Sequence, residues 1–236
     1  MEHEEYTAEN YPSFGKKYAD EKAIISLTSW KARINTVSKT LFSLIKQCPG
    51  FHIVLVLSEE EFPKMMDELP DNLKLFVDNE LIEVLWVYRN YRCFKKWIFT
   101  MDKYRDVPII SADDDCIYTE NYAQNLYNKW QENKNSVITY KKYIFDNHHF
   151  QHGPATCYPP SVITDKIPFM NMEFVKVGGD DVLVGYILEQ KGIKIIEYKK
   201  KVPYYFHDTF EPLSAKTLYP KNYYRLFKNK LKNYKL

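Results

Sequence analysis

Three consecutive aspartates, Asp113, Asp114 and Asp115, are the residues whose type and spacing most clearly indicate chemistry. The largely apolar run 107–112 leads directly into them, and a short run of this kind is typical of a buried strand in a parallel sheet. Open α/β sheets bind ligands at the carboxyl ends of such strands. Because carboxylate oxygens suit Mg²⁺, Mn²⁺ or Ca²⁺, the triplet predicts a site for a hard divalent cation. An exposed Asp-rich turn is the alternative, and the buried approach strand disfavours it.

A second acidic pair, Asp180 and Asp181, follows Gly178 and Gly179 and precedes a segment that reads as a helix. At a helix N-terminus one aspartate can cap the helix while the other favours the helix dipole. A Gly-Gly turn also lets the backbone approach another group closely, and a carboxylate there can act as a general base toward a hydroxyl. The spacing alone leaves capping and catalysis equally open.

Histidines offer two further candidates. His207 ends a late predicted strand, and Asp208 beside it could orient the imidazole, although a lone histidine is more often a packing residue. His148, His149 and His152 contain the i, i+4 spacing of a helical zinc site. They lack the glutamate of H-E-x-x-H and fall in a segment that we expect to be an irregular loop, so they indicate zinc only weakly.

Glycine-based phosphate sites are excluded by the sequence. The chain has only seven glycines and contains neither G-x-G-x-x-G nor G-x-x-x-x-G-K-[ST]. A dinucleotide fingerprint and a P-loop are therefore ruled out. If a nucleotide binds, a metal ion and cationic side chains must hold its phosphates.

Strands and helices alternate from the N-terminus and must position these residues. Predicted strands cover 23–27, 51–57, 81–87 and the run before the triplet. A first predicted helix starts at Thr36 or Ser38, and a second runs from the Ser58/Glu61 capping box to about Leu69. Two more helices are predicted from Phe94 to Tyr104 and from Glu120 to Glu132. This order implies right-handed βαβ units and a parallel sheet. Side chains alternate along extended backbone, so we expect Asp113 and Asp115 on one side and Asp114 on the other.

The second half of the chain is less regular. Segments 136–143 and 154–164 are rich in Tyr, Val and Pro and suit mixed or edge strands. A helix over 182–190, ended by Gly192, and late strands over 193–198 and 202–207 complete the prediction. Because no repeat or linker-like run interrupts the chain, we expect one domain over 1–220, with residues 1–20 as an N-terminal arm.

Charge is concentrated at the C-terminus. Residues 221–236 hold six of the 33 basic residues and none of the 31 acidic ones, so the rest of the chain has a net charge of −4. A nucleic-acid binder would usually spread positive charge over a face of its fold, so no nucleic-acid partner is expected. The segment reads as a basic amphipathic helix with an apolar stripe formed by Tyr223, Phe227, Leu231 and Tyr234. It could lie on an anionic membrane surface or dock on the body with solvated lysines, and both interpretations stay open.

The remaining features indicate a reducing compartment. The four cysteines, Cys48, Cys93, Cys116 and Cys157, form no C-x-x-C pair and read as reduced thiols of a cytosolic protein. The polar start of the chain contains no signal-peptide pattern, and no apolar run is long enough to span a bilayer. We expect a cytoplasmic protein that is soluble or peripheral on the inner face of the cell membrane.

Taken together, these residues resemble the GT-A glycosyltransferases, which transfer a sugar from a nucleotide sugar. The likeness spans residues 22–210. Residues 25–34 (I-S-L-T-S-W-K-A-R-I) resemble the first strand and donor-base loop of bacterial GT-A enzymes, and 112–118 (A-D-D-D-C-I-Y) their D-x-D motif. Residues 180–187 (D-D-V-L-V-G-Y-I) are similar to the acidic turn of fringe-type and β1,3-galactosyltransferase-type inverting enzymes, and 206–208 (F-H-D) sit where many members have a metal-binding histidine.

The resemblance implies a GT-A (Rossmann-like) α/β domain, with a mostly parallel central sheet flanked by helices, and a set of site residues. Asp181 would be the catalytic base, with Asp180 as the second candidate. The implied ligands of Mn²⁺ or Mg²⁺ are Asp113, Asp115 and His207. Donor contacts would come from Thr28, Ser29, Arg33, Lys95, Lys96, Asp113 and Asp114.

The function implied by this resemblance is metal-dependent transfer of a sugar from a nucleotide sugar, with a UDP-sugar favoured, to a hydroxyl of a glycan or lipid-linked glycan. The expected outcome is inversion, in the synthesis of a bacterial surface glycan such as lipooligosaccharide or capsule. The alternatives are a retaining GT-A transferase and a non-catalytic, Ca²⁺-dependent lectin-like domain. A sugar-nucleotide pyrophosphorylase is disfavoured because its Gly-rich N-terminal loop is missing.

Overall fold

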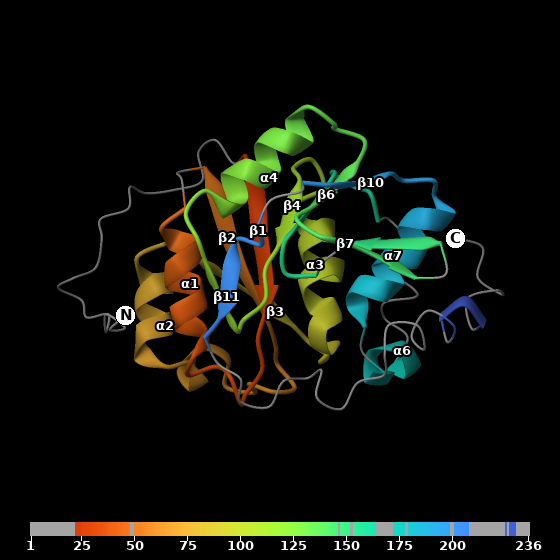
Figure 1. Ribbon diagram of the computed structural model, residues 1–236. Helices are drawn as coiled ribbons and strands as arrows, with labels where there is room; N and C mark the ends of the chain where they lie inside the picture. Colours follow the sequence, from red (N-terminus) through yellow and green to blue (C-terminus); the bar gives the residue numbers. More distant parts are fainter. Residues whose placement is uncertain are drawn as a thin grey trace.

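The computed structural model of the chain is shown in Figure 1. It describes residues 22–47, 50–145, 147–151, 153–163, 172–177, 179–198, 201–207, 225 and 227–229. The predicted arm over 1–20 lies outside the described residues, as does most of the predicted helix over 221–236. In the part that is described, no helix has the length and hydrophobicity that crossing a membrane requires.

A seven-stranded sheet forms the centre of the fold, in the order β10-β6-β9-β4-β1-β2-β3. Its strands are β1 (Ala23–Thr28), β2 (Phe51–Ser58), β3 (Glu83–Val87), β4 (Ile109–Ser111), β6 (Val137–Thr139), β9 (Thr156–Tyr158) and β10 (Ile195–Glu197). All neighbouring pairs are parallel except those of β9, which runs antiparallel to both β4 and β6. The predicted α/β fold with a mostly parallel sheet is therefore confirmed, and β9 occupies an interior position rather than an edge.

Two small antiparallel sheets accompany the central one. Strand β5 (Cys116–Tyr118) pairs with β11 (Tyr204–Phe206), which brings the late part of the chain back to the strand that follows the aspartate triplet. Strands β7 (Lys142–Phe145) and β8 (His148–Gln151) form a hairpin that lies along α7 (Asp180–Gln190) (Figure 1).

Helices cover both faces of the central sheet. Because side chains alternate along β1, this strand contributes to the hydrophobic core on each face. Ile25 and Leu27 pack in one core cluster with α1 (Val37–Ile45), α2 (Asp71–Asp78) and α4 (Tyr122–Gln131). Ile24 points the other way, into a cluster with α3 (Lys95–Lys103), α6 (Met172–Val177) and α7. These β1 side chains are fully buried, and each contributes about 1.5–3 kcal/mol relative to exposure. The carboxyl edge of β1 and β4 is thus held by a core on both faces.

The segment between β2 and β3 differs from the prediction. No helix starts at the Ser58/Glu61 pair; the Ser58 hydroxyl donates to the Glu61 carboxylate (3.0 Å), and turns lead to a 3₁₀ helix, η1 (Met65–Glu68). Pro63 disfavours helical backbone at the residue before it, and Met65 has a positive φ of 51°, so a regular helix cannot continue. Helix α2, which the sequence analysis did not predict, follows Pro70.

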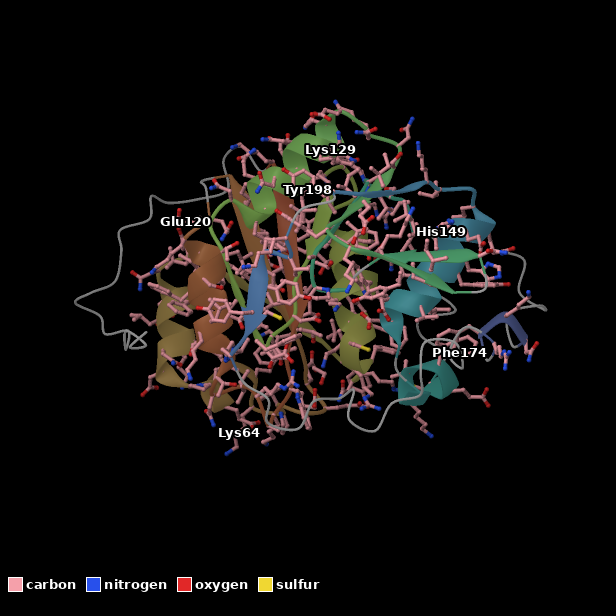
Figure 2. All side chains as sticks on the ribbon, in the orientation of Figure 1. Lys64, Glu120, Lys129, His149, Phe174 and Tyr198 are labelled. Atoms are coloured by element: carbon pink, nitrogen blue, oxygen red, sulfur yellow. The ribbon has the colours of Figure 1, made fainter. Side chains whose placement is uncertain are left out.

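The histidine cluster also differs from the prediction. His148 and His149 lie on β8, where consecutive side chains point to opposite faces, rather than in an irregular loop. Figure 2 labels His149 on this strand. His148 Nδ1 lies 2.7 Å from a Glu189 carboxylate oxygen, whereas His149 is exposed. His152 lies outside the described residues. Cys93, Cys116 and Cys157 are free thiols, and Cys48 lies outside the described residues.

Candidate active site

The aspartate triplet lies in the turn between β4 and β5, at the carboxyl edge of the sheet. Strand β4 is the parallel neighbour of β1, and the Ala112 N–H donates to the Ser26 carbonyl (2.9 Å). The loop that follows β1 therefore lies beside the triplet. Thr28, the last residue of β1, donates its hydroxyl to the Val56 carbonyl of β2 (2.7 Å).

Arg33 and Ser29 of that loop bind the middle aspartate. Arg33 Nη1 lies 2.7 Å from Asp114 Oδ1, and the Ser29 hydroxyl donates to Asp114 Oδ2 (2.6 Å). The same Nη1 atom lies 3.0 Å from Asp115 Oδ2. Burial opposes the charge on Arg33, but the Asp114 and Asp115 carboxylates outweigh it and raise the guanidinium pKa. The Arg33 cation is thus an internal counter-ion for two of the three aspartates.

The predicted alternation of the three aspartates is wrong in part. Asp114 and Asp115 share Arg33, whereas the Asp113 carboxylate lies 2.6 Å from Lys96 Nζ of α3. The reason is that the chain leaves extended conformation after Ala112 and forms a turn at Asp114 and Asp115.

His207 is brought to the triplet by the pairing of β11 with β5. Its backbone N–H donates to the Asp115 carbonyl (3.0 Å), and its Nε2 lies 3.0 Å from the Thr40 hydroxyl oxygen. That hydroxyl donates its single proton to the Asp114 carbonyl (2.9 Å), so Nε2 of His207 must be the donor to Thr40. A neutral imidazole in this arrangement has its lone pair on Nδ1. Within the described residues, however, no three His, Cys, Asp or Glu side chains form a metal-ligand set.

Asp113 and Asp115 nevertheless fit part of a divalent-cation site. Their side chains are 35% and 15% exposed, so both carboxylates can reach a ligand at the sheet edge. Burial, followed by the negative charge of Asp113, raises the pKa of Asp115 to about 6, and a bound cation would relieve that repulsion. Mg²⁺ is commonly held by one or two carboxylates together with substrate phosphates, so a third protein ligand is not required.

Two adjacent lysines of α3 have different partners. Lys95 Nζ donates to Glu61 and to Asn90, at 3.0 Å each, and so faces the loops after β2 and β3. Lys96 Nζ donates to Asp113 (2.6 Å) and lies 3.2 Å from Asp180 Oδ2. Burial alone would lower the pKa of Lys96, but the two carboxylates raise it well above its usual value. Lys96 is therefore charged and contacts both acidic centres.

The acidic pair begins α7 directly. Gly179, with a positive φ of 76°, is the N-cap residue, so neither aspartate occupies that position. Asp180 Oδ2 accepts from Trp97 Nε1 (2.8 Å) and lies beside Lys96. Although burial opposes its charge, the Lys96 cation lowers the pKa of Asp180. The side chain of Asp180 is thus engaged with α3 rather than capping its own helix.

Asp181 has a different environment. Its Oδ1 accepts the Val182 N–H (2.9 Å), and its backbone carbonyl accepts from Gln151 Nε2 of β8 (2.9 Å). Burial, followed by the charge of Asp180, raises the pKa of Asp181 to about 7. Environments that separate the pKa values of two neighbouring carboxyls typically give them separate roles. With a pKa of about 7, the Asp181 carboxyl can exchange a proton near neutral pH.

Several residues of this region were not among the predicted site residues. Trp97 and Gln151 bind the two members of the acidic pair, and Thr40 links His207 to the triplet. At Gly185 of α7, an added Cβ would approach Phe150 of β8 to 2.5 Å, so only glycine allows this close approach. A glycine in the interior of a predicted helix was a signal for such packing; the contacts of Trp97, Gln151 and Thr40 had no comparable signal.

Comparison with known proteins bears on the fold. No family model matches the chain, and no curated protein matches it. The crystal structure of S. aureus TarS 1-349 in complex with UDP-GlcNAc is similar, with 13% identity and a TM-score of 0.60 over 91% of this chain and 68% of that chain. Another crystal structure of TarS 1-349 has 13% identity and a TM-score of 0.56 over 78% of this chain. The match covers 60% of the length of that TarS chain.

The similar structures also include a mannosyltransferase. The mannosyltransferase PcManGT from Pyrobaculum calidifontis, in complex with GDP-Man and Mn²⁺, matches with 12% identity and a TM-score of 0.52, over 75% of this chain and 54% of that chain. At these identities the likeness establishes the fold. The chain has the α/β fold of glycosyltransferases whose structures are known in complex with nucleotide sugars.

Proposed function

We propose that the protein is a metal-dependent glycosyltransferase that moves a sugar from a nucleotide sugar, with a UDP-sugar favoured, to a hydroxyl group of an acceptor. One observation carries the proposal. Two acidic centres far apart in the sequence, the triplet 113–115 and the pair 180–181, meet at one edge of the sheet, where Lys96 contacts both. Similar folds occur in the TarS complex with UDP-GlcNAc and in the mannosyltransferase complex with GDP-Man and Mn²⁺.

The donor would bind at the triplet. Asp113 and Asp115 would hold Mn²⁺ or Mg²⁺, with His207 as the third candidate ligand. When bound, the cation would neutralise charge that builds up on the leaving nucleoside diphosphate. The absence of a glycine-rich phosphate loop in the sequence is the reason that this task falls to a cation. The hydrogen bonds that Asp114 accepts from Ser29 and Arg33 would fix the conformation of the loop after β1, which adjoins the triplet.

Asp181 would act on the acceptor. Its carboxylate takes the proton of the acceptor hydroxyl while the oxygen attacks the anomeric carbon, and the bond from that carbon to the diphosphate oxygen breaks. The electron pair of that bond leaves with the nucleoside diphosphate. Asp180 is the less suitable base, because Lys96 and Trp97 already bind it and its pKa is lowered. A base on the face opposite the leaving group produces inversion of the anomeric centre.

The acceptor and location proposed here follow from the family likeness in the sequence. The acceptor would be a glycan or a lipid-linked glycan of the bacterial surface, such as lipooligosaccharide or capsule. The enzyme would work in the cytoplasm on the inner face of the membrane, with the basic segment 221–236 as a candidate contact with anionic lipid.

A thermal-shift screen of UDP-, GDP- and CMP-sugars, each with and without Mn²⁺, tests the proposal. A ligand that binds only the folded state at 100 times its Kd stabilises it by about 2.7 kcal/mol, so a true donor raises the Tm measurably. We expect a UDP-sugar to do so in the presence of Mn²⁺ but not in the presence of EDTA. Stabilisation by free glycans with Ca²⁺, and by no nucleotide, would instead support the lectin-like alternative.

A further inference from the structure

Lys96 contacts both acidic centres through one atom. Its single Nζ atom lies 2.6 Å from Asp113 Oδ1, between β4 and β5, and 3.2 Å from Asp180 Oδ2, at the start of α7. We call these three side chains the Lys96 bridge. Its lysine is only 4% exposed, whereas the two carboxylates are 35% and 14% exposed. The bridge thus connects a buried cation to two carboxylates that border the site.

The surroundings fix Lys96 in this place. The Ser26 hydroxyl of β1 donates to the Lys96 backbone carbonyl (2.8 Å) and lies 2.8 Å from the Thr100 hydroxyl, so α3 is locked to the sheet at this turn. The neighbouring Trp97 donates its Nε1 to the same Asp180 oxygen that Lys96 contacts. If Lys96 were removed, the largely buried Asp180 carboxylate would keep its charge without the neighbouring cation, which is strongly unfavourable.

We propose that Lys96 is a positioning residue that ties the aspartate triplet to the start of α7 and thereby holds Asp181 in place relative to the bound donor. This inference rests on the proposed function. A lysine that bound the donor phosphates directly would reduce donor affinity when removed. A lysine that acts through the Lys96 bridge would reduce turnover while donor affinity largely survives, because Asp113 and Asp115 are still present to hold the cation while the base is displaced.

The effect on turnover should be large. A displacement of about 1 Å in a catalytic group can cost about 10²-fold in rate. Without Lys96, the Asp180 carboxylate loses the cation that it contacts, so its repulsion of the Asp181 carboxylate is less offset and displaces the first turn of α7. Trp97 would still donate to Asp180, so the helix start is loosened rather than lost.

The first experiment compares Lys96→Met, Lys96→Arg and the control Lys103→Met. Lys103 is on the same helix and pairs with Glu83 at 2.6 Å, away from both acidic centres. Calorimetry gives the Kd of UDP with Mn²⁺, and donor hydrolysis or transfer gives kcat. We expect Lys96→Met to lower kcat by about 10²-fold while the Kd changes by less than about threefold. The kcat of Lys96→Arg should be at least about tenfold higher than that of Lys96→Met. The control should leave both unchanged.

Equal losses of kcat and UDP affinity in Lys96→Met would overturn the inference and make Lys96 a donor ligand. A kcat within about threefold of wild type would overturn it as well, because the base would then be placed without the lysine.

The second experiment does not depend on activity and uses the double variant Lys96→Met/Asp180→Asn. Lys96→Met leaves the Asp180 charge without its cation, and Asp180→Asn removes that charge while Trp97 can still donate to the amide oxygen. The double variant should therefore have a Tm at or above that of Lys96→Met alone. If Lys96→Met does not fold, recovery of folding in the double variant supports the bridge, and failure of both overturns it. Additive losses of Tm would also overturn it.

These results separate the two proposals. If wild type binds no nucleotide with Mn²⁺, the proposed function fails, and the Tm comparison still decides whether the Lys96 bridge couples the two segments. If wild type binds UDP and turns over donor, the kcat and Kd comparison decides whether Lys96 positions the base.

Discussion

The Nη1 atom of Arg33 lies 2.7 Å from Oδ1 of Asp114, and only 6% and 8% of the two side chains are exposed. The middle residue of the aspartate triplet is thus neutralised from within the protein by a loop more than eighty residues earlier in the chain. Its neighbours Asp113 and Asp115 keep more exposure at the sheet edge. The three aspartates therefore divide into one internal anchor and two candidate ligands.

Arg33→Met should destabilise the protein strongly. Removing one partner of a buried ion pair leaves an uncompensated charge and costs about 3–5 kcal/mol, and Asp114 would be left with the Ser29 hydroxyl. Urea denaturation measures the loss. Arg105→Met is the matched control, because Arg105 pairs with Asp102 at an exposed position and should cost less than about 1 kcal/mol. Similar losses in the two variants would contradict the anchoring role.

Asp115→Asn should abolish the Mn²⁺ dependence of nucleotide binding. The amide cannot supply the charge that a divalent cation requires, so we expect the Kd of UDP with Mn²⁺ to rise by more than about tenfold. Calorimetry with Mn²⁺ and with EDTA measures this. Asp106→Asn, at an exposed position before β4, is the control and should bind as wild type does. Full Mn²⁺-dependent binding by Asp115→Asn would remove Asp115 from the site.

Asp181→Asn should lose turnover by about 10²–10⁴-fold while UDP binding survives, since a general base contributes about that much to rate. The Asn side chain can still accept the Val182 N–H, so the local structure is retained. In wild type, kcat/KM should rise as the pH increases through about 7, because Asp181 must be deprotonated to accept the proton. Unchanged turnover in the variant, or a flat pH profile in wild type, would assign the base elsewhere.

The same carboxyl should make stability depend on pH. Because the pKa of Asp181 is about 7 in the folded state and 3.8 ordinarily, its stabilising contribution is full below the ordinary value and is lost as the pH rises through about 7. Asp181→Asn should therefore be more stable than wild type at about pH 8, and each kcal/mol of added unfolding free energy should raise its Tm by about 2–4 °C. The difference in Tm should shrink at about pH 5. Calorimetric scans at the two pH values check this; a difference that grows toward acid would contradict it.

Gly185→Ala should destabilise the protein although alanine favours helices. The new Cβ would lie 2.5 Å from Phe150 Cδ1, and overpacking of this kind costs about 1–3 kcal/mol, against a propensity gain of about 1 kcal/mol at most. Gly153→Ala is the control, because its Cβ would meet only Asp181 Cβ at an ordinary 3.8 Å. Chemical denaturation compares the two. Equal stability would mean that β8 can move away from α7 without cost.

Much of the first half of the fold could be predicted because local patterns and tertiary packing agree there. The apolar runs of β1, β2 and β4 are buried on both faces, and such runs are typical of parallel strands. Helix α2 escaped prediction because it has only eight residues, of which only Leu73 and Phe76 are buried, so its apolar pattern is too short to identify a helix. The place of β9 between β4 and β6 depends on long-range pairing that no local pattern contains.

The candidate site could likewise be predicted only in part. Residue types and the Gly-Gly turn indicated both acidic centres, and the structure brings them together at Lys96. The sequence could not distinguish the two adjacent lysines, because the phase of α3 relative to the sheet decides which one faces the triplet. Residue type and spacing also could not separate Asp180 from Asp181, which only the family resemblance ranked, since their environments come from Trp97 and β8, far away in the sequence.

The order of strands in the sheet has a consequence for synthesis of the chain. Strand β1 is apolar and pairs with β2 soon after both emerge from the ribosome, but its other neighbour arrives much later, since Ile24 pairs with Ile109. Until β4 is made, a nascent chain carries an uncovered hydrophobic strand edge, which favours aggregation. Strand β4 then covers that edge and delivers the aspartate triplet in the same event. We therefore expect the proposed cation site to form only after β4 has covered this edge.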